Sequence, residues 1–164
     1  MKTGFWKQID GDLQDFEILE NEVLGKLDGY EVDLSFFLHG YCTIAAIVLH
    51  EQFGYPMYRQ WDEDEVEACG NPSLSLSEFP VIHDFCKARN GFVDIRGIID
   101  DSESFFAEFE DFFEEVDYTI LSDEEFAEAK KNYRTDIGSS TFSRLYQMCA
   151  NWIEKHSNYY TERS

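Results

Sequence analysis

The chain has 164 residues, of which 43% are hydrophobic and 16% aromatic. A chain of this length and apolar content should bury one sizeable core, so we expect an ordered single domain spanning residues 1–164. Thirteen Lys and Arg against 34 Asp and Glu leave a formal net charge of -21. A surface this negative repels phosphate groups, so nucleic acid and anionic membranes are not expected as partners, whereas a basic protein is.

The sequence shows neither the pattern of a signal peptide nor that of a membrane-spanning segment. The first ten residues lack the apolar centre of a signal peptide, and the apolar run 44–49 is far too short to cross a bilayer. Four cysteines, at positions 42, 69, 86 and 149, are too sparse for a secreted disulfide scaffold. We therefore expect a cytoplasmic protein with reduced thiols.

In the first half of the chain, apolar spacing predicts two helices and a polar loop. Residues 12–27 carry a partial helical stripe. Residues 40–53 are apolar nearly all round, which is typical of a helix packed inside a domain, and Gly54 is expected to end it. Residues 62–77 are acidic and polar, and are interpreted as a surface loop.

Two strands and a helix are predicted next. Residues 80–88 and 91–99 flank an Asn90-Gly91 pair, which is a hairpin signal. An amphipathic helix with a buried aromatic stripe follows, because phenylalanines recur there at helical spacing. Those phenylalanines are Phe105, Phe106, Phe109, Phe112 and Phe113.

The last part of the chain predicts one strand and two helices. Residues 116–121 favour a short strand, and Ser122 with Glu125 forms a capping box for a helix that ends near Asn132. The final helix places Cys149 on its core face. The expected fold class is therefore α+β, with the helix at residues 40–53 packed on a small antiparallel sheet and additional helices at the C-terminus.

Three residues in chain order predict nucleophilic chemistry. Cys42 begins the apolar helix, where the partial positive charge of the helix N-terminus should lower its pKa. His83 can act as the general base, and Asp94, on the second strand, can hold the imidazole in one tautomer. The backbone N–H of Cys42 is an expected oxyanion donor, with His39 or Ser35 as the second.

This pattern resembles the papain-like cysteine enzymes, especially their NlpC/P60-like and transglutaminase-like branches. The resemblance covers about residues 35–97 and rests on Gly40-Tyr41-Cys42 before a buried helix, followed by a hairpin that carries His83 and an acid eleven residues later. It implies that Cys42 is the nucleophile, His83 the base and Asp94 the orienting acid. It also implies an amide-bond enzyme acting on a protein or peptide, without a cofactor or metal.

The identity of the orienting acid stays open at this stage. If Asn90 and Gly91 form a two-residue turn, Asp94 pairs with Lys87, and His83 lies four residues further along its strand. A longer turn or a bulge is then needed to bring the two together. Asp84 and Asp100 are the alternatives.

Two other functions compete with the thiol enzyme. Thirteen acids and no Lys or Arg lie between Gly97 and Ala129, which favours an acidic binding or inhibitor protein that imitates nucleic acid or captures a basic partner. His39 with Cys42, and His83 with Cys86, form two His-x2-Cys pairs of the kind that bind structural zinc. The zinc hypothesis requires both segments to be irregular, because strand residues three apart face opposite sides.

Overall fold

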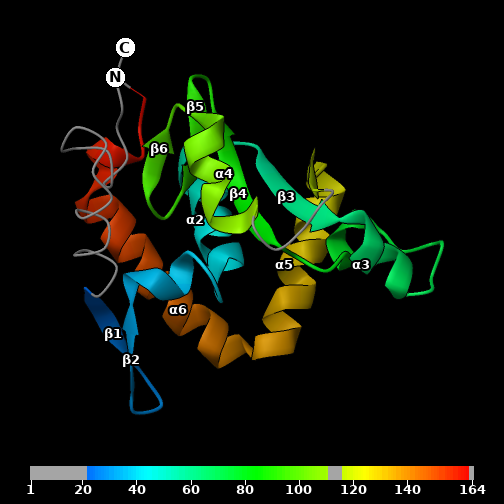
Figure 1. Cartoon of the computed structure of the whole chain (residues 1–164). Coiled ribbons are helices and arrows are strands. Elements are labelled where there is room, and N and C mark those ends of the chain that lie inside the picture. The colour runs from blue at the N-terminus through cyan, green and yellow to red at the C-terminus, as the bar shows by residue number, and fades with distance from the viewer. Residues whose placement is uncertain (1–21, 111–115, 163–164) are drawn as a thin grey trace.

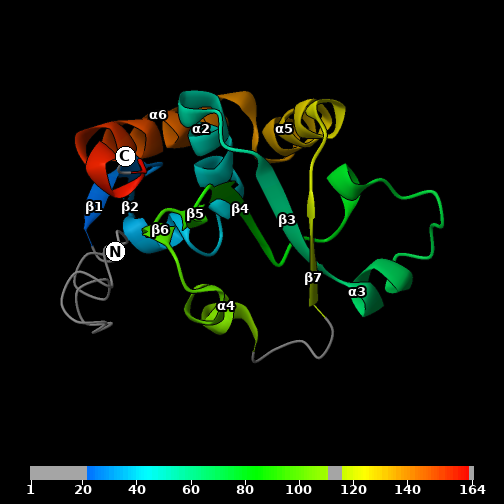
Figure 2. The same ribbon diagram turned by 90° about the horizontal axis from the view of Figure 1, so that it is seen from above.

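The structure is a computed structural model that describes residues 22–110 and 116–162. A five-stranded antiparallel sheet forms its centre, with the strand order β6-β5-β4-β3-β7. The strands are β3 (Met57–Asp62), β4 (His83–Ala88), β5 (Gly91–Asp94), β6 (Gly97–Ile99) and β7 (Val116–Ile120). The helices α2 (Cys42–Phe53), α5 (Asp123–Ile137) and α6 (Ser139–Lys155) lie on one side of this sheet, and α4 (Ser102–Glu110) lies on the other (Figures 1 and 2). The expected α+β fold, with the Cys42 helix packed on an antiparallel sheet, is confirmed.

The helix expected at residues 12–27 is wrong for the part that the structure describes. Val23–Leu27 is strand β1, which pairs with β2 (Tyr30–Asp33) in a separate hairpin. Asp28 and Gly29 both have positive φ, as the two central residues of a tight hairpin turn require. The Asp-Gly pair is a hairpin signal, and it overrides the weak helical stripe. Residues 12–21 lie outside the described residues.

The α2 helix is buried from Cys42 to Leu49. This explains why its sequence has no polar face, since β4 and β5 cover one side and α6 another. Gly54 ends the helix as expected: its φ of 74° is left-handed, and its N–H donates to the carbonyl of His50.

The acidic segment after β3 is more ordered than the sequence predicted. It contains the short helix α3 (Glu63–Ala68), followed by a 3-10 turn at Leu76–Glu78. The Asp62 carboxylate caps α3 by accepting from the N–H of Glu65. Acids in the first turn also suit the positive end of a helix, so the charge that was interpreted as a loop signal stabilises a helix instead.

The hairpin of β4 and β5 turns one residue earlier than expected. Gly91 pairs with Ala88, so Arg89 and Asn90 form the turn. The predicted strand at residues 80–88 begins at His83, and the predicted strand at 91–99 is broken by a turn at Ile95 and Arg96 into β5 and β6. The shift brings Asp94 two residues closer to His83 than the sequence argument allowed.

Aromatic rings fill the sheet face beneath α4. Phe105 and Phe106 are buried as expected, and they contact Phe85 and Phe92 of the hairpin. The side chains of Phe109, Phe112 and Phe113 lie outside the described residues.

The C-terminal helices follow the sequence closely. The capping box at Ser122 and Glu125 is present, although α5 runs to Ile137 rather than ending near Asn132. The buried face of α6 includes Cys149, as predicted. In the part of the chain that the structure describes, every helix is too short or too polar to cross a bilayer.

Candidate functional site

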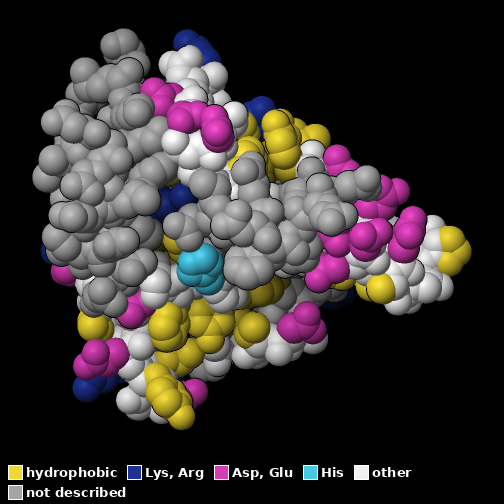
Figure 3. Space-filling view, in the orientation of Figure 1, with side chains coloured by type: hydrophobic (Ala, Val, Ile, Leu, Met, Phe, Trp, Pro, Cys, Tyr) yellow, Lys and Arg dark blue, Asp and Glu magenta, His cyan; other side chains and the backbone are white. Residues whose placement is uncertain are grey.

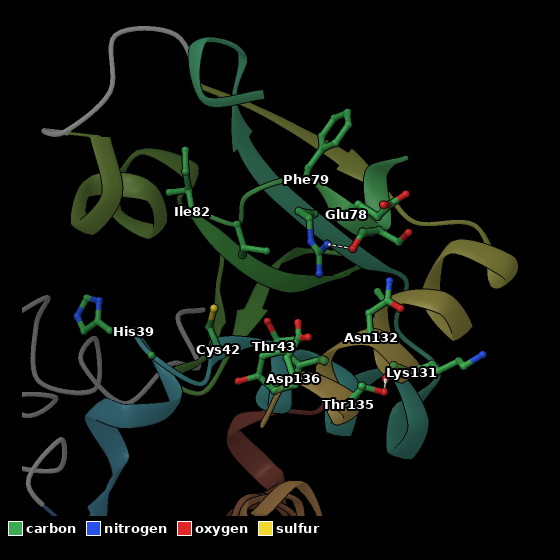
Figure 4. Close-up of a pocket in the computed structure, with 16 residues that line it drawn as sticks. His39, Cys42, Thr43, Glu78, Phe79, Ile82, Lys131, Asn132, Thr135 and Asp136 are labelled. Atoms are coloured by element: carbon green, nitrogen blue, oxygen red, sulfur yellow. Dashed lines mark hydrogen bonds between the residues drawn. The ribbon is translucent and has the colours of Figure 1, made fainter. Parts of the chain in front are cut away.

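Cys42 lies at the edge of a cavity of about 740 Å³. The thiol belongs to the first residue of α2, and 5% of the residue is exposed. One wall of the cavity comes from α5, and the opposite wall comes from the segment that leads into β4 (Figure 4). Lys131, Asn132, Thr135 and Asp136 line the first wall, and Glu78, Phe79, Val81 and Ile82 line the second. A polar wall thus faces a largely apolar one, with the thiol between them.

The thiol of Cys42 is not activated in this structure. Its burial, together with the neighbouring Asp84 carboxylate, raises the pKa of Cys42 to about 12. The Asp84 backbone N–H donates to Sγ over 3.5 Å, and Arg59 also lowers the pKa, but both effects are smaller than the cost of burial. The expectation that the helix N-terminus lowers this pKa is therefore wrong, because desolvation of the thiolate dominates.

Asp84 itself belongs to a buried ion pair. Its two carboxylate oxygens accept from Nε and Nη2 of Arg59, at 2.8 and 3.0 Å, and Oδ2 also accepts from the Thr43 hydroxyl at 2.7 Å. Nη1 of Arg59 donates to the carbonyls of Leu76 and Ser77. Asp84 therefore connects α2, β3 and β4 around the thiol. Its carboxylate binds Arg59 and Thr43 and not His83, so this alternative for the orienting acid is wrong.

On the other side of the sheet, His83 is paired with Asp94. The distance from His83 Nε2 to Asp94 Oδ2 is 2.9 Å, and both side chains are buried. Arg96 holds the same carboxylate with its backbone N–H at 2.8 Å and with Nη2 at 2.7 Å. Nη2 also donates to the carbonyl of Phe105 in α4. The structure therefore places a fixed carboxylate on the imidazole, and among the three candidate acids it is Asp94 that binds the ring.

The charge states of Asp94 and His83 follow from their burial and from the groups that contact them. Burial alone would raise the pKa of Asp94, but the charge of Arg96 and the hydrogen bonds from His83 and Arg96 hold it well below its usual range. Burial lowers the pKa of His83. Asp94 is therefore a carboxylate and His83 a neutral ring at neutral pH. Because a carboxylate can only accept, Nε2 carries the ring proton, and Nδ1 is the basic nitrogen.

The side chain of His83, the first residue of β4, and the Cys42 thiol lie on opposite faces of that strand. Side chains alternate along a strand, so His83 and Phe85 point toward α4, while Asp84 and Cys86 point toward α2. Within the described residues, no hydrogen bond joins the thiol to the imidazole, and Sγ instead contacts the backbone of Asp84, the residue next to His83. The structure thus brings His83 and Asp94 together, and places Cys42 beside that pair without direct contact.

The expected oxyanion donors are differently placed. The N–H of Cys42 already donates to the His39 carbonyl over 3.4 Å, and the Ser35 hydroxyl donates to Asp33. His39 lines the cavity, but its ring points away from Cys42 (Figure 4).

The zinc hypothesis is wrong. Among the described residues, no group of three or more His, Cys, Asp or Glu side chains is arranged to hold a metal ion. Strand alternation is the reason, because His83 and Cys86 lie on opposite faces of β4, and the Cys86 thiol donates to the Ala46 carbonyl in α2.

Sequence reasoning missed the two arginines that hold the aspartates. Arg59 and Arg96 are both about as buried as the core, at 3% and 2% exposure. Only 13 Lys and Arg occur in the chain, so an arginine next to a large apolar residue, Tyr58 for Arg59 and Ile95 for Arg96, was an available signal for a buried ion pair.

Comparison with family models, curated proteins and solved structures found no match to this chain. Any function assigned to the cavity therefore depends on the geometry described above.

Proposed function

We propose that the chain is a thiol-dependent enzyme that acts on an amide bond of a protein or peptide. Cys42 is the nucleophile, His83 the general base and Asp94 the group that orients the base. One observation carries the proposal: a buried imidazole is locked onto a carboxylate at the strand position adjacent to the residue that contacts the Cys42 thiol. It supports the proposal because thiol chemistry needs a base of fixed tautomer close to a nucleophile at a cavity, and His83 is next in the chain to the residue that contacts the thiol.

The reaction begins from a neutral pair. Since the pKa of Cys42 is about 12, the thiol must lose its proton as it attacks, rather than rest as a thiolate. Sγ bonds to the carbonyl carbon while its proton passes to Nδ1 of His83, and the carbonyl oxygen takes the electron pair of the broken π bond. The tetrahedral intermediate then collapses, the C–N bond breaks, and the imidazolium gives its proton to the leaving amine. Water or a second amine next attacks the thioester, which releases the product and restores the thiol.

Proton transfer requires the thiol and the imidazole to come closer than they do without substrate. Catalytic hydrogen bonds are often long in unliganded enzymes and tighten when substrate binds. His83 is the first residue of β4, and its side chain leaves the strand on the face opposite to the thiol, so the movement that the proposal requires is a local rearrangement at this end of β4 that turns Nδ1 toward Cys42 Sγ.

The test uses acyl transfer from p-nitrophenyl acetate, a small activated ester. The protein is incubated with the ester near neutral pH, and acetylation of each cysteine is followed by peptide mass spectrometry. We expect Cys42 to be acetylated and His83→Gln to slow this acetylation at least tenfold, because general-base assistance contributes about a hundredfold or more. Cys69 is exposed and distant in sequence from the site, so its acetylation rate is the internal control and should not change. Equal rates at Cys42 in the two proteins would refute the proposal.

A second candidate function is an acidic binding protein for a basic partner. Its support is the net charge of -21 together with exposed acids on α3, which lie on the side of the molecule where acidic side chains gather (Figure 3). Several acids of the stretch 97–129 have side chains outside the described residues. Replacing the exposed Asp64 and Glu67 by Lys should lower the affinity for a lysine-rich peptide and make that affinity less dependent on salt. Cys42→Ala should change neither the affinity nor its salt dependence.

A further inference from the structure

Tyr160 is a fully buried tyrosine of the C-terminal segment, and its hydroxyl lies between α6 and the turn that joins β5 to β6. The hydroxyl donates to the carbonyl of Ile95 at 2.5 Å and accepts from Nε1 of Trp152, in α6, at 3.1 Å. The backbone carbonyl of Tyr160 in turn accepts from the Tyr55 hydroxyl at 2.7 Å. Two hydrogen bonds therefore hold the ring hydroxyl of Tyr160, and a separate one holds its backbone.

The acceptor of the Tyr160 hydroxyl is the turn that carries the orienting carboxylate. Ile95 stands between Asp94 and Arg96, and it is itself fully buried. The backbone N–H that follows Ile95 belongs to Arg96 and donates to Asp94 Oδ1 at 2.8 Å. A shift of the Ile95 carbonyl would rotate this peptide unit, and the Asp94 carboxylate would move with it.

The same C-terminal segment holds the opposite end of the hairpin. The Glu162 carboxylate accepts from the backbone N–H groups of Arg89 and Asn90, at 2.7 and 3.1 Å. These two residues form the turn between β4 and β5. Tyr160 and Glu162 thus contact the two turns that flank β5, the strand that ends at Asp94.

We propose that Tyr160 is a positioning residue for the His83–Asp94 pair: its hydroxyl holds the Ile95 carbonyl, and so sets the carboxylate that fixes the tautomer of the imidazole. The catalytic meaning of this role depends on the proposed thiol enzyme, whereas the effect on the imidazole does not. The described part of the C-terminal segment is not among the residues that line the cavity, so its effect on the site passes through the β5–β6 turn.

The experiment compares Tyr160→Phe with Tyr55→Phe in protein labelled with ¹⁵N-histidine. Each variant loses one hydroxyl, but only the Tyr160 hydroxyl binds the turn beside Asp94. In the wild type, we expect well-separated Nδ1 and Nε2 shifts for His83, as a single tautomer gives. In Tyr160→Phe, these two shifts should move toward each other because the second tautomer becomes populated, and acetylation of Cys42 should slow several-fold. Tyr55→Phe should retain the wild-type shifts.

The outcomes separate this proposal from the proposed function. Unchanged His83 shifts in folded Tyr160→Phe would overturn the positioning role, as would an equal change in Tyr55→Phe, which would indicate a general loosening. If Tyr160→Phe does not fold, Trp152→Phe provides the readout. This variant removes the Nε1–H group that donates to the Tyr160 hydroxyl but keeps the hydroxyl itself. It should move the two His83 shifts in the same direction as Tyr160→Phe, but by a smaller amount. If wild-type Cys42 is never acetylated, the enzyme proposal fails, while the nitrogen shifts still decide the role of Tyr160.

Discussion

The two faces of the central sheet each bury an aspartate with an arginine, but they use the pair differently. On the α2 face, Asp84 is held by Arg59 from the neighbouring strand and by Thr43 from the helix. On the α4 face, Asp94 is held by Arg96 from its own turn and by His83 from β4. The first pair joins a helix and two strands, whereas the second joins the two strands of one hairpin and also connects that hairpin to α4.

This difference decides what each carboxylate does to its titratable neighbour. Burial raises the pKa of Cys42 and keeps the thiol protonated, and the Asp84 charge adds to this effect because it would repel a thiolate. The Asp94 charge accepts a hydrogen bond from His83, so it sets the tautomer of the ring. The same kind of ion pair thus suppresses charge on one face and directs a proton on the other.

The largest expected effect comes from breaking the α2-face pair. Arg59→Met leaves Asp84 buried without its main partner, and we expect the free energy of unfolding to fall by about 3–5 kcal/mol. Urea denaturation at pH 7 measures it. The matched control is the double variant Arg59→Met, Asp84→Leu, which removes both charges and should recover most of the loss. If Arg59→Met is as stable as the wild type, Asp84 is hydrated in the folded protein, and the Asp84–Arg59 pair cannot be compared with Asp94–Arg96 as a second buried ion pair.

The two faces should also control opposite ends of the pH-stability profile. On the α4 face, the folded pKa of His83 is lowered from 6.5, so the unfolded chain binds more protons below that value and stability should fall as pH drops through it. Asp94, whose folded pKa is lowered from 3.8, adds a further loss at more acidic pH. On the α2 face, the folded pKa of Cys42 is raised from 9.0 to about 12, so its contribution is full below pH 9 and is lost as pH rises through this range.

Urea denaturation between pH 5 and pH 10.5 separates these contributions, a range chosen to include the two unfolded-state values of 6.5 and 9.0. His83→Gln should flatten the acidic limb and leave the alkaline limb, and Cys42→Ala should do the reverse. Buried Cys86 and Cys149, whose pKa values are also raised, will keep part of the alkaline loss in Cys42→Ala. An acidic limb that persists unchanged in His83→Gln would contradict the assignment to the α4 face.

The smallest expected effect comes from an exposed ion pair, which tests whether burial is what makes the two sheet pairs matter. Lys130 Nζ lies 2.6 Å from Glu51 Oε2, and each side chain is 32% exposed. Because solvent screens such pairs, Lys130→Ala should lower the free energy of unfolding by less than about 1 kcal/mol. Lys131→Ala, one residue along on the exposed side of α5, is the control for the loss of a positive charge. A loss from Lys130→Ala comparable to that from Arg59→Met would remove the distinction.

Local patterns in the sequence predicted the elements that depend on neighbouring residues alone. The apolar run that begins at Cys42 predicted a buried helix, and the Ser122 and Glu125 spacing predicted a capped one, because both signals act within a few residues. The hairpin was predicted with its turn one residue too late, since Asn-Gly is a statistical preference, and the actual register depends on which side chains enter the core. The Asp28-Gly29 turn was an equally local signal that was overlooked.

The sequence by itself determined the α+β fold class and the three residues from which a thiol chemistry can be argued. Only the tertiary structure decided how they are used: it paired His83 with Asp94, placed Arg59 and Asp84 beside Cys42, and put thiol and imidazole on different sides of β4. The physical reason is that a hydrogen bond depends on distance and a pKa on burial and surrounding charge. The partners that set both come from segments that meet only when the chain is folded, such as Thr43 with Asp84 and Tyr160 with Ile95.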